Sequence, residues 1–149
     1  MKKLATLLVV FALLVTSGVA LAAGTVVLTT TDNVMGQDVV IYTYTMTADS
    51  ADGSFPATAS RPIDGWIIRV ETNPGATAPT ALWGLTLLDQ DGLDVMGGVI
   101  AAGATTGRSA TATQHVMAPQ PYVRGAVTIT PTGNSVNSAV VVLRITVLR

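Results

Sequence analysis

Residues 138–148 read SAVVVLRITVL, and this stretch decides the fold. Apolar side chains recur at every second position, which is the period of a β-strand, where successive side chains point to opposite faces. One face carries Val141, Leu143, Ile145 and Val147, and we expect it to lie in the core. The opposite face is unusually apolar for a surface exposed to water, and it carries Val140, Val142, Arg144, Thr146 and Leu148.

The same period of two recurs along the rest of the chain. Residues 38–47 (DVVIYTYTMT), 65–72 (GWIIRVET), 82–89 (LWGLTLLD) and 122–130 (YVRGAVTIT) read as strands, and residues 25–30 and 113–117 as shorter ones. Turn residues rich in Asp, Asn, Gly and Pro separate them. We therefore expect an all-β fold, an antiparallel β-sandwich or jelly-roll-like domain of seven to eight short strands.

The N-terminal residues have the pattern of a secretory signal peptide. Lys2 and Lys3 precede an apolar run, and Ala20 and Ala22 supply the small residues that a signal peptidase requires. The sequence thus predicts a signal helix at residues 1–22, cleaved after Ala22, and a single domain at residues 23–149. A retained membrane anchor is the alternative, but no positive cluster follows the run, so we expect no stable membrane insertion after cleavage.

Composition excludes several classes of function. The part after residue 22 holds six arginines and no lysine against eight aspartates and Glu71, a net charge near −3, so we expect no nucleic-acid partner. The chain has no cysteine and one histidine, His115, and it lacks a nucleophile motif and a phosphate-binding loop. We expect a protein that is not an enzyme and that has no cofactor, with calcium as the one exception to consider.

The acidic stretch DQDGLD at residues 89–94 is the candidate calcium loop. Asp89, Asp91 and Asp94 could supply hard oxygen ligands. The glycine comes fourth instead of sixth, however, and no bidentate glutamate follows. Asp-Gly flanked by alternating apolar residues is more typical of a hairpin turn, which is the interpretation we favour.

Two tryptophans could offer stacking surfaces to a carbohydrate if they are exposed. In residues 65–72, strict alternation places Trp66, Ile68 and Val70 in the core and Arg69 and Glu71 in water, where the last two would form a cross-strand charge pair. Trp83 also falls on a predicted inner face. The residues considered as ligand or partner contacts are Trp66, Trp83, Arg108, Val140, Val142 and Arg144.

Several segments, taken in order, resemble a group of small β-rich proteins of tailed phages and prophages, hypothetical or virion structural proteins. They are GWIIRVET (65–72), NPG (73–75), APT (78–80), DGLDVMGG (91–98) and RSATATQ (108–114). The resemblance implies a β domain that self-associates or decorates a particle, and it carries no catalytic residue. Because virion subunits assemble in the cytoplasm, the predicted export signal favours a cell-surface relative.

From these features we expect an exported, non-enzymatic structural or assembly protein that associates with itself or with other structural subunits. Its location would be secreted, periplasmic or at the cell surface, or in a virion if the phage resemblance holds. The alternative is a secreted module that binds a glycan or another surface polymer.

Overall fold

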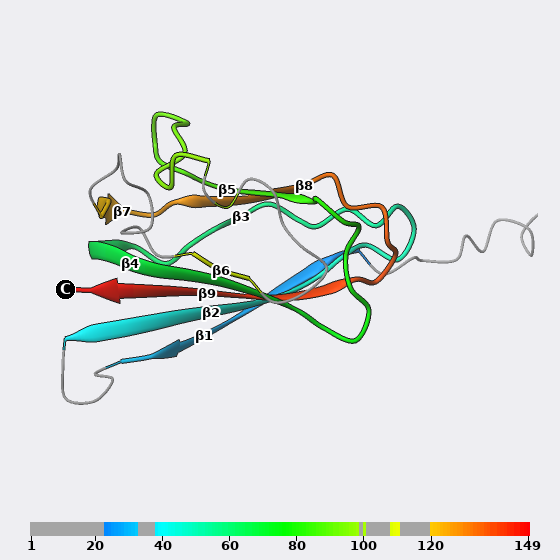
Figure 1. Cartoon of the computed structure of the whole chain (residues 1–149), viewed down its shortest axis with the longest axis horizontal. Coiled ribbons are helices and arrows are strands. Elements are labelled where there is room, and N and C mark those ends of the chain that lie inside the picture. The colour runs from blue at the N-terminus through cyan, green and yellow to red at the C-terminus, as the bar shows by residue number, and fades with distance from the viewer. Residues whose placement is uncertain (1–22, 33–37, 99, 101–107, 111–119) are drawn as a thin grey trace, which may run out of the picture.

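The computed structural model describes residues 23–32, 38–98, 100, 108–110 and 120–149, with residues 108–110 described by their backbone. This part of the chain is all-β and forms antiparallel sheets (Figure 1). Its strands are β1 (Thr25–Thr31), β2 (Val39–Thr47), β3 (Thr58–Ala59), β4 (Ile63–Pro74), β5 (Gly84–Leu88), β6 (Arg108–Ala110), β7 (Tyr122–Gly125), β8 (Thr128–Thr132) and β9 (Val140–Leu148).

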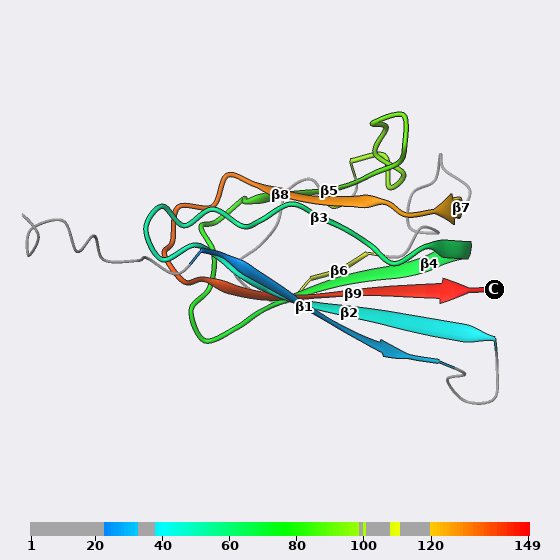
Figure 2. The same cartoon turned by 180° about the vertical axis from the view of Figure 1, so that it is seen from behind.

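Two sheets lie one above the other, in an open, half-barrel arrangement (Figure 2). The larger sheet has the order β1-β2-β9-β4-β6, and β7 also pairs with β4. The smaller sheet has the order β3-β8-β5. The final strand of the sequence is therefore central in the larger sheet, between β2 and β4, and non-local pairing holds the sheet together.

The core lies between the two sheets, and β9 is at its centre. Val141, Leu143, Ile145 and Val147 are all fully buried, which confirms the inner face predicted for this strand. On β2 the residues opposite them are also buried, and these are Val40, Tyr42, Tyr44 and Met46. The smaller sheet contributes Leu85, Leu87 and Ile129, and Trp83 packs against Phe55 with ring centroids 5.9 Å apart.

A β-bulge in β4 overturns the predicted inner face of that strand. Ile67 pairs with Val147 and Arg69 with the adjacent Thr146, so Ile68 is an extra residue between them. Such an extra residue shifts the alternation by one position. Ile67 and Val70 are consequently buried, Ile68 is half-buried, and Trp66 is 42% exposed. The prediction that Trp66 lies in the core was wrong for this reason.

Gly65 allows β4 to approach the end of β9 closely. Its φ is +158°, a conformation that L side chains rarely adopt. A Cβ at this position would meet the carbonyl oxygen of Leu148 and lie 2.8 Å from Cγ1 of Val147. The absence of a side chain therefore permits the contact beside Trp66.

The described residues form nine strands, not the seven to eight predicted, and some predicted elements differ in extent from the strands observed. The predicted strand at residues 122–130 is divided, because the chain leaves the larger sheet at Gly125 (φ +111°) and enters the smaller one at Thr128. Asp94 forms an isolated bridge with Leu88, and residues 95–98 form turns, with positive φ at Gly97 and Gly98. The predicted signal at residues 1–22 and the short strand at 113–117 lie outside the described residues. In the described part, no helix is long and apolar enough to cross a membrane.

The bulge leads to a prediction about neighbouring isoleucines. Ile67→Ala should lower the free energy of unfolding by about 2 to 5 kcal/mol, because it leaves a cavity in the core. Ile68→Ala should cost at most about half as much, because that side chain is only partly buried. Urea unfolding of both variants measures the difference. A larger loss for Ile68→Ala would mean that strict alternation holds in β4.

Candidate binding site

Four side chains share the outer face of the larger sheet where β4 and β7 pair. Trp66 lies opposite Tyr122, and Asp64 lies opposite Arg124. All four residues are exposed. Because alternate residues of paired strands point to one face, the register itself places an aromatic pair beside an acid and a base. We call Trp66, Tyr122, Asp64 and Arg124 the aromatic platform.

Internal contacts hold the aromatic platform in place. The rings of Trp66 and Tyr122 meet edge to face, with centroids 5.2 Å apart and an interplanar angle of 65°. The Tyr122 hydroxyl donates a hydrogen bond of 2.6 Å to Oδ1 of Asp64. Tyr122 is nevertheless 53% exposed, so the pair presents ring surface to solvent.

A hollow of about 440 Å³ lies beside the platform. It is lined by Pro62, Asp64, Gly65, Trp66, Tyr122 and Arg149. The Arg149 guanidinium donates to the Tyr42 hydroxyl over 3.3 Å, and its backbone N–H donates to Asp38 O over 2.9 Å. A guanidinium carries five N–H donors, so this anchoring fixes its position without exhausting its capacity for further bonds.

The hydrogen bond to Asp64 raises the pKa of the Tyr122 phenol above its ordinary value. Loss of the proton would remove the bond and place a phenolate beside a carboxylate. Burial and the negative charge of Asp64 act in the same direction, and Arg124 opposes them. The bond to Asp64 therefore favours the neutral, hydrogen-bonding form of Tyr122.

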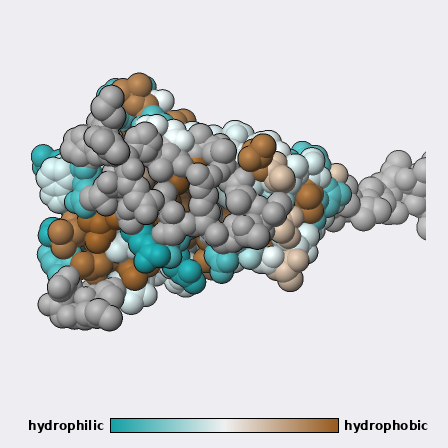
Figure 3. Space-filling view, viewed as in Figure 1, coloured by the Kyte–Doolittle hydropathy of each residue, from teal (hydrophilic) through white to brown (hydrophobic). Residues whose placement is uncertain are grey.

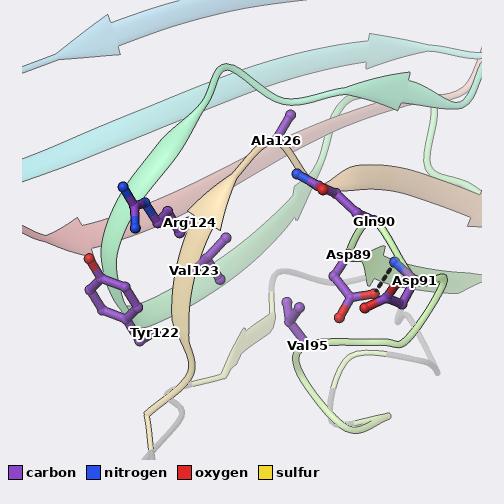
Figure 4. A pocket seen from close by; sticks show the side chains of 8 residues that line it. All are labelled: Asp89, Gln90, Asp91, Val95, Tyr122, Val123, Arg124 and Ala126. Atoms are coloured by element: carbon purple, nitrogen blue, oxygen red, sulfur yellow. Dashed lines mark hydrogen bonds between the residues drawn. The ribbon is translucent and has the colours of Figure 1, made fainter.

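The acidic loop lies on the other side of β7, around a second hollow of about 260 Å³. Figure 4 shows Asp89, Gln90 and Asp91 on the loop, while Tyr122 and Arg124 project from β7 in the opposite direction. Val123, which alternates with these two, is buried. Tyr122 and Arg124 nevertheless also line this second hollow, so the acidic loop and the aromatic platform adjoin each other along β7.

The carboxylates of the acidic loop bind the loop's own backbone. Asp89 Oδ1 accepts from the backbone N–H groups of Asp91 and Leu93, both over 2.9 Å. Asp94 accepts from Leu87 and Met96 at Oδ1, over 3.2 and 3.1 Å, and from Gly98 at Oδ2, over 2.8 Å. This is the predicted turn, with Gly92 at φ +79°. Among the described residues, no group of three or more acidic or histidine side chains is arranged to hold a metal ion.

The other predicted contact residues are dispersed over the fold. Trp83 is fully buried in the core and so is not offered to a ligand. Val140, Val142 and Arg144 lie half-buried on the outer face of β9, as predicted. Arg108 pairs with Thr72 through the backbone of β6, and its side chain, like His115, lies outside the described part of the chain. Arg69 and Glu71 form a 2.8 Å ion pair within β4, not across strands as predicted.

The sequence reasoning missed Asp64, Tyr122 and Arg149. Asp64 and Trp66 are two residues apart, as are Tyr122 and Arg124, so the spacing already places each pair on one strand face. What was missing is the register that brings β4 and β7 together, because these strands are distant in the sequence.

Comparison with protein-family models, with curated proteins and with solved structures gives no match. The residues themselves therefore carry the functional argument.

The turn interpretation of the acidic loop can be tested with two variants. Asp94→Ala should lower stability by about 1 to 3 kcal/mol, because it leaves three backbone N–H groups without their acceptor. Asp91→Ala removes an exposed carboxylate and should change stability by less than about 0.5 kcal/mol. Thermal unfolding measures both, and EDTA should leave the midpoint unchanged. A midpoint that rises on adding calcium would show instead that the loop binds the ion.

The platform also predicts a pH dependence. Because the pKa of Tyr122 is raised on folding, the bond to Asp64 contributes stability that is present below the ordinary tyrosine pKa of about 10 and is lost as pH rises through the folded value. An ultraviolet pH titration follows ionisation of the tyrosines, and subtracting the titration of Tyr122→Phe leaves the contribution of Tyr122. In an Asp64→Ala background this contribution should move to lower pH, because the hydrogen bond that raises the pKa is gone. An unmoved titration would contradict the assigned bond.

Proposed function

We propose that this protein is an exported, non-enzymatic structural subunit that self-associates through the free edge of β1. In this proposal the two sheets form a sandwich of the jelly-roll type, used at a cell surface or in a virion-like particle. The resemblance of residues 65–114 to phage structural proteins motivates the location. The observation that carries the proposal is the chemistry of the β1 edge.

Among the described strands of the larger sheet, β1 is the outermost, at the lower edge of the sheet in Figures 1 and 2. It pairs with β2 without interruption, from Thr25 opposite Thr47 to Thr31 opposite Ile41. Its sequence, TVVLTTT, has no charged residue and no proline. A free edge presents unpaired N–H and C=O groups, and natural proteins usually protect it with lysine, proline, a bulge or a very short strand. By comparison, β3 at the edge of the smaller sheet has only two residues.

An unprotected edge of this kind suits a second copy of the same chain. In an antiparallel pair related by a two-fold axis at Leu28, Val27 of each copy lies beside Thr29 of the other. Cross-strand pairs of β-branched residues are favourable, and a two-fold contact closes on itself instead of growing into a fibre. Val26 and Leu28 pack against the core and hold β1 in register for the contact.

The outer face next to this edge continues the same chemistry. It carries the neutral residues Val27, Thr29, Thr43, Thr45 and Val142, with Arg144 opposite Thr43 as a charged neighbour. A joined sheet would extend this mostly neutral face across both copies.

Two valine variants test which part of this surface is used. Val27 is 59% exposed on the β1 edge, and Val142 lies on the same face at the centre of the sheet. Val27→Lys should convert a dimer to a monomer, since lysine on an edge strand disfavours pairing. Val142→Lys adds the same charge away from the edge and should leave the dimer intact. Size-exclusion chromatography with light scattering measures the mass, and thermal unfolding checks that both variants fold.

A monomer of the unaltered protein at high concentration would overturn the proposal. A dimer that resists Val27→Lys and dissociates with Val142→Lys would place association on the sheet face and contradict the role of the edge.

A further inference from the structure

The exposed aromatic residues of the described chain are concentrated in one place. Tyr42, Tyr44, Phe55 and Trp83 are buried, whereas Trp66 and Tyr122 are exposed and touch each other. Burial of a large aromatic side chain stabilises a fold, so an exposed pair of this kind marks a surface that contacts something else. Two features of the fold hold the pair on the surface. The bulge in β4 directs Trp66 outward, and a hydrogen bond to Asp64 fixes Tyr122.

We propose that the aromatic platform, together with Arg149, binds a neutral saccharide. A pyranose ring has an apolar C–H face that stacks on an indole, and hydroxyl groups at its rim that need paired donors and acceptors. Here Trp66 supplies the exposed ring, Asp64 supplies acceptor oxygens, and Arg149, which also lines the hollow, supplies donors. A planar guanidinium and a carboxylate are the groups that can bond two adjacent hydroxyls at once.

The surroundings favour a sugar over the other ligands that stack on aromatic residues. A nucleic acid would need a run of basic groups along its backbone, whereas here only Arg124 and Arg149 accompany Asp64, and the chain after residue 22 has a net charge near −3. An acidic polymer would meet Asp64 directly. Figure 3 shows apolar and polar surface side by side at the end of the molecule where β9 terminates, and there Leu148 is 38% exposed beside Trp66. This mixture matches a ligand that is itself both apolar and hydroxylated.

The position on the fold is also suitable. The platform lies on two paired strands and not on a loop, so its groups are held at fixed spacing, which reduces the entropy cost of binding. It is at the edge of the larger sheet opposite β1. Dimerisation through β1 would therefore leave the platform open on each copy, and the saccharide proposal does not rest on the proposed self-association.

Tryptophan fluorescence of the exported protein tests the proposal directly. The probes are the neutral oligosaccharides cellohexaose, chitohexaose and maltohexaose. We expect a saturable change in emission with at least one of them, because Trp66 is exposed to the ligand. Trp83 is buried, so its emission should stay constant during the titration. Trp66→Ala should weaken binding at least about tenfold, as should Tyr122→Ala, which removes the second ring. Isothermal titration calorimetry follows binding where the tryptophan is absent.

Leu82→Ala is the matched control, because Leu82 is a large exposed side chain outside the platform, and it should bind as the unaltered protein does. Thermal unfolding confirms that each variant is folded. The titrations extend to about 10 mM of each oligosaccharide, a concentration at which binding with a Kd near 1 mM would be detected. The absence of any response to the three probes would overturn the proposal. So would unchanged binding in a folded Trp66→Ala variant. Dissociation of the dimer by Trp66→Ala would likewise overturn it and identify the platform as a protein contact.

Discussion

The hydrogen-bonded ladder that β9 makes with β2 on one side and β4 on the other is the constraint on which the rest of the structure depends. Its four inward side chains are fully buried, so the register of both neighbours is set by the need to keep them in the core. The outer strands then take their places relative to this centre, with β1 added to β2, and β6 and β7 added to β4. Both proposed surfaces therefore derive their geometry from the central ladder.

The bulge at Ile68 is a local irregularity in that ladder, and it places an aromatic side chain on the surface. Without the extra residue, the chain would keep a simple alternation through β4. With it, Ile67 and Val70 both reach the core, and Trp66 stays on the outer face beside Tyr122. Bulges often redirect a side chain near a site, and here the redirected side chain is an exposed tryptophan. The core keeps Val70 and takes Ile67 in place of Ile68, and the surface gains an aromatic platform.

The two surfaces differ in the kind of contact that they offer. The β1 edge offers main-chain hydrogen bonds and neutral β-branched side chains, which suit a strand of an identical copy. The platform offers ring surface with a carboxylate and guanidinium groups, which suit a small amphipathic ligand. They lie at opposite edges of the larger sheet, so one protein could assemble and bind at the same time. A structural subunit that also binds a surface saccharide would combine the two functions considered from the sequence, which are structural assembly and glycan binding.

The sequence by itself determined the all-β class, the position of most strands, the inner face of β9 and the acidic turn. These features depend on residues close in the chain, where alternation and turn chemistry are direct physical signals. The tertiary structure alone decided the exposure of Trp66, the pairing of Trp66 with Tyr122 and the free edge at β1. A bulge appears only when two strands are compared, and the partners of β4 in β7 and β9 are about 56 to 82 residues away. Pairing between distant strands, which no local pattern encodes, therefore made the candidate site.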